Sequence, residues 1–126
     1  SDISAFISGD IDAGLFVITG KLMKGISLED AENALQREIE NICRHGIEES
    51  ELQKVKNRVE AIIEFSEMRV LDKAMNLAYY ELLGDADLAN SLVDRYAEVT
   101  VNEVVAAAKQ IFRPENCSTL HYVAKN

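Results

Sequence analysis

The sequence predicts an α+β fold, in which a small antiparallel or mixed sheet packs against helices in the order β-β-α-α-α-α-α-β. Two β-prone segments open the chain, and five segments with apolar residues spaced by threes and fours follow. A last β-prone segment comes after the only proline, Pro114. The 126 residues, 48% of them hydrophobic, suit one domain or part of one. We therefore interpret residues 1–126 as a single, partial domain.

The first two segments predict a β-hairpin. The first strand begins at about Asp2, and its apolar positions alternate with polar ones in the period-2 pattern of a half-buried strand. Phe6 is the exception, because it falls on the polar face. Gly9 marks the turn, and the second strand runs from about Gly14 to Leu22 through the most β-prone stretch of the chain.

The next two segments predict helices with defined ends. Ser27 can cap the first helix, and Gly46 can supply the left-handed residue that ends it. Its apolar stripe comprises Leu28, Ala31, Leu35, Ile39 and Ile42. The second helix begins near Glu48 and is expected to break near residues 65–67.

The last part of the chain predicts three more helices and a strand. A third helix is expected over Met68 to Leu83, and a shorter fourth helix opens at Asp85 or Asp87. Thr100 to Glu103 has the capping-box pattern that starts the fifth helix. That helix ends before Pro114, and residues 117–123 are expected to form the final strand.

Histidine is the residue type most suggestive of chemistry, but its pattern does not predict a zinc site. His45 and Glu48 match the first and fourth positions of His-x-x-Glu-His, whereas the fifth position is Glu49. Gly46 is expected to end the helix, so the required one-turn spacing is lost. His45 is better explained as a cation at a helix C-terminus, and His121 as a structural residue of the last strand.

No other pattern points to an active site. Cys43 and Cys117 form neither a Cys-x-x-Cys pair nor a disulfide framework. Cys43 and His45 are two residues apart and do not face each other on a helix. Tyr79 and Tyr80 are expected to be core and surface residues. The carboxylates are expected at helix N-termini and on solvated faces. The sequence thus offers no catalytic, cofactor-binding or metal-ligating residue, and no cofactor is expected in this chain.

The net charge of the chain argues against two classes of binding partner. The chain carries 13 basic and 22 acidic residues, a net charge of −9. This balance argues against nucleic acid, because a polyanion requires a basic surface, and against anionic membranes. No apolar run is long enough for membrane insertion. A soluble protein of a bacterial-type cytoplasm or periplasm is compatible with the sequence, and its localisation stays open, as does a homo-oligomeric state.

Several stretches, in order along the chain, resemble the inactive C-terminal domain of insulinase/pitrilysin-type zinc metallopeptidases, the inverzincins. The first three are Gly14–Ile18, Ala31–Ile42 and Gly46–Lys56, where Glu51, Leu52 and Lys56 match the family's Glu-Leu-x-x-x-Lys. Glu48 replaces the usual Thr or Ser cap. Further similar positions are Ser66, Ala74–Ala78, Gly84–Asp85, Val99–Val104, Ala107, Ala108 and Pro114–Asn116.

The resemblance implies a lobe that works beside another lobe. Members of this family have two similar α+β lobes that close around a peptide, and the first lobe holds zinc through His-x-x-Glu-His and a further glutamate. The second lobe lacks these ligands and helps to enclose the substrate. An Arg and a Tyr that often contact the peptide would fall at or before Asp2–Ser4, where this chain has no such pair. No site residue is therefore carried over.

Three functional hypotheses follow. The first is a non-catalytic lobe that binds peptide beside the zinc lobe of a parent metalloendopeptidase. The second is a peptidase-derived scaffold or processing-partner subunit without proteolytic activity. The third is an unrelated helical interaction module, which a helical circular dichroism spectrum without strand would support. In the first hypothesis, the first strand is a candidate to bind extended peptide through a sheet edge.

Overall fold

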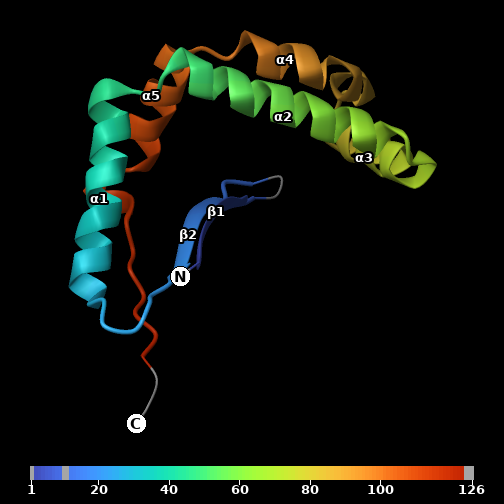
Figure 1. Cartoon of the computed structure of the whole chain (residues 1–126). Helices are drawn as coiled ribbons and strands as arrows, with labels where there is room; N and C mark the ends of the chain where they lie inside the picture. Colours follow the sequence, from blue (N-terminus) through green and yellow to red (C-terminus); the bar gives the residue numbers. More distant parts are fainter. Residues whose placement is uncertain (1, 10–11, 124–126) are drawn as a thin grey trace. The chain divides into compact units, whose positions relative to one another are not determined.

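A computed structural model describes residues 2–9 and 12–123 (Figure 1). It confirms the α+β class, with a small antiparallel sheet and a larger helical part. The chain divides into two compact units, one formed by residues 1–46 and 105–126 and the other by residues 47–104. The assignment of residues 1–126 to a single domain stays a prediction.

The sheet of the first unit is the predicted hairpin. Strand β1 (Asp2–Ser8) pairs antiparallel with β2 (Leu15–Lys21) along their full lengths. Ser4 lies opposite Thr19, and their hydroxyl oxygens are 2.9 Å apart, within hydrogen-bond distance. Gly14 precedes β2 where a Cβ atom would collide with the carbonyl of Ser8. The backbone segments at Ser8 and Gly14 approach each other so closely that position 14 requires glycine.

Helix α1 (Leu28–His45) has the ends that the sequence predicts. The Ser27 hydroxyl accepts a hydrogen bond of 3.0 Å from the backbone N–H of Asp30, which satisfies one orphan donor of the first turn. Gly46 has φ 76°, the left-handed region that glycine adopts without a steric penalty. The residues of the predicted apolar stripe are half-buried except Leu28, which is 38% exposed.

The second unit begins with a helical hairpin. Helix α2 (Glu49–Glu67) and helix α3 (Val70–Leu82) pack against each other and are separated at Met68 and Arg69. The break thus lies slightly later than the sequence predicts. The hydroxyl of Ser66 donates to the carbonyl of Ile63 at 2.8 Å. This bond makes Ser66 a residue of the last helical turn and not of the break.

The end of α3 is closed by a glycine motif. The N–H of Asp85 donates to the carbonyl of Tyr80 at 3.0 Å, and the N–H of Gly84 donates to that of Glu81 at 2.9 Å. This is the Schellman pattern, in which Gly84 has φ 102°. Two of the carbonyls that the last turn leaves without intrahelical partners are satisfied in this way.

The prediction of the fourth helix is only partly confirmed. Asp85 does open it, because its carboxylate accepts a hydrogen bond of 3.0 Å from the N–H of Asp87. The first part, η1 (Ala86–Ser91), is a 3-10 helix, and only α4 (Leu92–Glu98) is α-helical. The Asp85 turn favours tight i→i+3 bonding, as in the bond of 3.2 Å from the Leu88 N–H to the Asp85 carbonyl.

Helix α5 (Val101–Ile111) starts at the predicted capping box and ends before Pro114. A 3-10 turn, η2 (Pro114–Asn116), follows it. The prediction of a final strand over residues 117–123 is wrong, since these residues form no strand. A strand needs a neighbouring chain for its hydrogen bonds, and β1 and β2 pair only with each other among the described residues.

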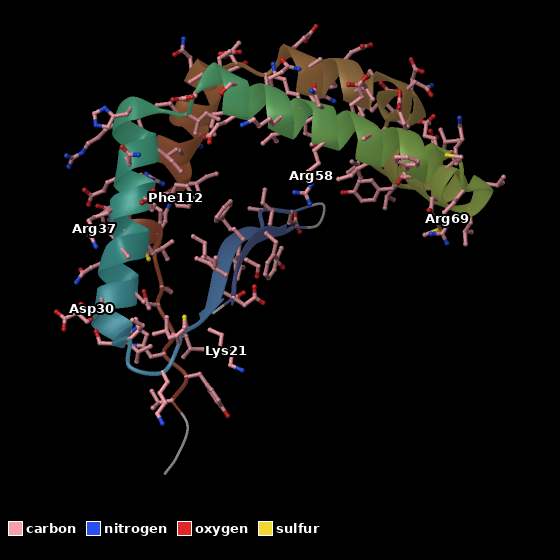
Figure 2. The ribbon with its side chains drawn as sticks, in the orientation of Figure 1. Lys21, Asp30, Arg37, Arg58, Arg69 and Phe112 are labelled. Atoms are coloured by element: carbon pink, nitrogen blue, oxygen red, sulfur yellow. The ribbon has the colours of Figure 1, made fainter. Side chains whose placement is uncertain are left out.

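The described residues bury little apolar surface. Leu52 and Ala108 are the two hydrophobic residues below one tenth exposure, at 5% and 6%. In the first unit, the ring of Phe16 on β2 meets the ring of Phe112 edge to face, with centroids 5.0 Å apart; Figure 2 marks Phe112 just after α5. Such a pair is worth about 0.5–1.5 kcal/mol beyond its buried area. Large apolar side chains elsewhere remain open to solvent.

Candidate functional surfaces

The two histidines lie far apart in the sequence, on different segments of the first unit. His45 is the last residue of α1, and Gly46 ends the helix directly after it. His121 lies in the non-helical segment after η2, with its Nε2 atom 3.5 Å from a carboxylate oxygen of Glu32. His121 thus has a structural contact, and His45 lies in the last turn of α1, where a cation opposes the helix dipole.

The cysteines and carboxylates form no metal-ligating group in the part of the chain that the structure describes. No three His, Cys, Asp or Glu side chains gather there in a suitable arrangement. Cys43 is half-buried on α1, and Cys117 is exposed after η2; both are free thiols. These residues do not fit the zinc ion that the family implies for its catalytic lobe. No helix among the described residues meets the length and apolarity needed to cross a membrane.

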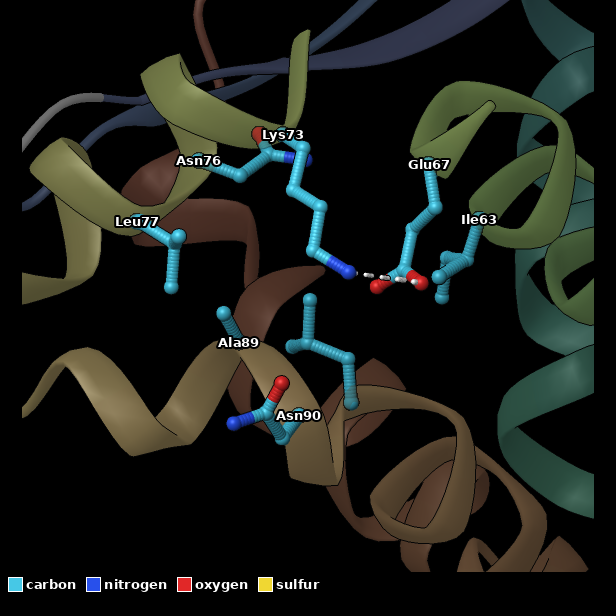
Figure 3. Close-up of a pocket in the computed structure, with 8 residues that line it drawn as sticks. Ile63, Glu67, Lys73, Asn76, Leu77, Ala89 and Asn90 are labelled. Atoms are coloured by element: carbon cyan, nitrogen blue, oxygen red, sulfur yellow. Dashed lines mark ion pairs between the residues drawn. The ribbon is translucent and has the colours of Figure 1, made fainter. Parts of the chain in front are cut away.

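A small pocket lies in the second unit (Figure 3). It is lined by residues of α2, α3, η1 and α4, and Lys73 points across it to Glu67 with an N–O distance of 3.7 Å. Its volume of about 10 Å³ is room for about one water molecule. Ligand pockets typically measure about 300–1,000 Å³. The pocket is therefore a packing gap that the ion pair closes.

The hairpin offers exposed strand surface. All seven residues of β1 are exposed, including Ile3 at 68% and Ile7 at 71%. The sheet has two strands, so β1 carries one row of backbone groups that faces no other strand among the described residues. Such a row is able to pair with a further extended chain. The sequence pattern predicted a half-buried strand, whereas the structure leaves both faces of β1 open.

The exposed stripe of α3 is the second surface. Leu71, Met75, Ala78 and Leu82 lie at intervals of three and four, which places them on one side of the helix. Leu71 is 68% exposed, Met75 63% and Leu82 69%. We call these four residues the α3 stripe.

The opposite side of α3 is the packed one. Asn76 and Tyr80 are half-buried, while Tyr79 is 44% exposed. Tyr79 is thus the surface residue that the sequence predicts, whereas Tyr80 is half-buried and not part of the core. An amphipathic helix normally buries its apolar face. Since α3 packs through its more polar side, its apolar side is left exposed.

The sequence contained a signal for this surface. The spacing of Leu71, Met75, Ala78 and Leu82 is visible in the residues, but periodicity predicts only that a helix has an apolar side. Which side packs against α2 and η1 depends on residues distant in sequence. The structure was therefore needed to identify the α3 stripe as an exposed surface.

Together these features define an α+β fold with exposed apolar residues on β1 and α3 and, among the described residues, no cluster of metal-ligating side chains. Residues 1–59 match the family model described as the peptidase M16 inactive domain. This match confirms, for that part of the chain, the resemblance to the inactive C-terminal domain of insulinase-type peptidases. It covers β1, β2, α1 and the first part of α2. No curated protein and no solved structure matches the chain.

Proposed function

We propose that the chain is a non-catalytic C-terminal lobe that helps to bind and enclose peptide beside the zinc lobe of a parent metalloendopeptidase. The match of residues 1–59 to a peptidase inactive domain carries this proposal. In this proposal the zinc lobe of the parent holds the metal ion and catalyses the hydrolysis. This chain supplies surfaces for its partner lobe and for the peptide, and no step of the hydrolysis.

The exposed apolar residues support a lobe that acts in contact with further protein. Leu71 and Leu82, at the two ends of the α3 stripe, have most of their surface open to solvent. Removal of apolar area from water contributes about 25 cal/mol per Å², from which the entropic cost of association is subtracted. A parent lobe that covers the α3 stripe therefore gains stability from it, in addition to any contact with the peptide.

The open edge of β1 supports the proposal that this lobe binds peptide. An extended peptide adds to a sheet edge through backbone hydrogen bonds, which depend little on its side chains. Ile3 and Ile7 lie on the same face of β1, four residues apart. Their apolar side chains can contact a peptide that pairs with this strand. β1 is therefore our candidate for the peptide-facing strand of this lobe.

Peptide cleavage by the parent's zinc lobe tests the proposal. It is measured with and without this chain, with Ile3→Asp/Ile7→Asp as the variant and Lys24→Ala, outside the hairpin strands, as its control. Activity that requires this chain, and that falls with the β1 variant, supports a substrate-enclosing lobe. Activity indifferent to this chain overturns the proposal and favours the scaffold or processing-partner subunit.

A further inference from the structure

All three methionines of the chain are open to solvent. Met23, after β2, is 61% exposed, and Met68, in the break between α2 and α3, is 77% exposed. Met75, on α3, is 63% exposed. Methionine more often fills irregular gaps in an apolar core, because its unbranched side chain adapts to them. Here the three thioether sulfurs are instead accessible to oxidants such as peroxide, which convert methionine to its sulfoxide.

Met75 differs from the other two methionines in its neighbours. It lies inside the α3 stripe, with Leu71 four residues before it and Ala78 three residues after it. These spacings place the three side chains on one side of the helix. Met23 lies outside the helices and strands, and Met68 lies between two helices. A polar group at position 75 would therefore divide a continuous apolar side, whereas one at position 23 would not.

The packing of α3 within this chain does not use the Met75 side chain. Asn76 and Tyr80, which are half-buried, lie on the other side of the helix. Asn76 and Leu77 line the small pocket of the second unit, as Figure 3 shows, and Met75 is not among its lining residues. Changes at exposed positions away from packed residues usually have little effect on stability. Met75 can therefore become polar while the chain stays folded.

We propose that Met75 is a reversible oxidation site, and that its sulfoxide interrupts the α3 stripe without unfolding the chain. With hydrogen peroxide, a sulfur lone pair attacks one peroxide oxygen and the O–O bond breaks. The proton of the transferred oxygen passes to the leaving oxygen, which departs as water, so that the sulfur is oxidised and the peroxide reduced by two electrons. Burial of the polar sulfoxide without a hydrogen-bond partner is unfavourable. The consequence for contact with the zinc lobe rests on the proposed function, whereas the oxidation itself does not.

The test treats the complete chain with hydrogen peroxide and then with a dithiol, which reverses disulfide and sulfenic acid formation at Cys43 and Cys117 but leaves sulfoxides. Peptide mass spectrometry measures oxidation at each methionine, and urea unfolding measures stability. Binding of an apolar fluorescent dye measures exposed apolar surface, and capture by the parent's zinc lobe measures partner contact. Met75→Leu is the resistant variant, and Met23→Leu, at nearly equal exposure, is its control. Each variant is compared with its own untreated form.

We expect Met75 to be oxidised as readily as Met23, with an unchanged urea midpoint. Oxidation should reduce dye binding and weaken capture about tenfold, as the burial of one unpaired polar group implies. Both losses should occur in the wild type and in Met23→Leu, but not in Met75→Leu. Treatment with methionine sulfoxide reductases should restore dye binding and capture.

Several results would overturn the oxidation site. They are a Met75 that resists peroxide, unchanged dye binding, or a loss that persists in Met75→Leu and so arises at another methionine. A chain that unfolds on oxidation also overturns it, because Met75 would then support the fold. If dye binding responds at Met75 but the untreated chain is not captured by the zinc lobe, the oxidation site stands and the proposed function fails. Equal capture of oxidised and untreated chains overturns only the consequence for partner contact.

Discussion

The carboxylate of Glu103 accepts two hydrogen bonds from Thr100, one from its backbone N–H and one from its hydroxyl, both 2.8 Å long. The backbone N–H of Glu103 in turn donates to the Thr100 hydroxyl oxygen at 3.3 Å. This reciprocal box begins α5 and satisfies donors that the first helical turn leaves free. Thr100 and Glu103 therefore fix the start of the last helix.

The box makes stability depend on pH. The hydrogen bonds from the N–H and hydroxyl of Thr100, with a smaller effect of Lys56, hold the pKa of Glu103 below its ordinary value of 4.5. A lowered folded-state pKa stabilises the fold above the unfolded value, and this stabilisation is lost as the pH falls through the folded pKa. The stability advantage of wild type over Glu103→Gln should be full well above pH 4.5 and should shrink as the pH falls through 4.5 and then through the lowered pKa of Glu103. Urea unfolding at several pH values measures it, and a constant difference would contradict the assignment.

Lys56 connects α2 to the end of α4. Its ammonium donates to the carbonyl of Ala97 at 2.7 Å, where a cation also opposes the helix dipole. Replacement by methionine keeps most of the stem, so we expect Lys56→Met to cost about 1 kcal/mol of unfolding free energy. Amide exchange of residues 92–98 should accelerate at the same time. The control is Lys54→Met, an exposed position on the same helix; equal effects of both variants would count against the bond.

Leu52 should be the most sensitive apolar position of α2. It is 5% exposed, and its truncation to alanine leaves a cavity that typically costs about 2–5 kcal/mol. Val55 lies on the same helix at 55% exposure, so Val55→Ala should cost well below 1 kcal/mol. Chemical denaturation of the two variants measures both values. Similar losses at the two positions would show that the core is not centred on Leu52.

The α3 stripe should matter for partner contact and not for the isolated chain. Leu71→Gln/Met75→Gln is expected to change the unfolding free energy of this chain by no more than about 0.5 kcal/mol, because both side chains are already exposed. The same variant should weaken capture of the chain by the parent's zinc lobe. Ala74→Gln, an exposed position beside the stripe, is the control. A loss of several kcal/mol in the isolated chain would place the stripe in its own core.

Local signals in the sequence predict the ends of the helices well. Ser27 and Thr100 cap helices through side chains three residues from their partners, and Gly46 is needed for its positive φ. These interactions span a few residues, so the printed order of residue types contains them. The hairpin is also local, since β1 ends at Ser8 and β2 begins at Leu15.

The failures come from interactions between distant parts of the chain. The final strand depends on a partner for residues 117–123, and β-propensity alone cannot supply one. Instead, Glu32 holds this segment through Thr119 and His121, a contact across more than 80 residues that no local pattern reveals. The outward direction of the α3 stripe is non-local for the same reason. The candidate surfaces therefore needed the structure, whereas the resemblance to the family could be seen in the ordered motifs along the sequence.

Peptide cleavage by the parent's zinc lobe, measured with and without this complete chain, tests the central claim most directly. We expect no cleavage by this chain alone and cleavage by the zinc lobe only, or at a much higher rate, when this chain is present. Cleavage by this chain alone would contradict its assignment as a non-catalytic lobe. A zinc lobe whose rate is unchanged by this chain would contradict its role in enclosing the substrate.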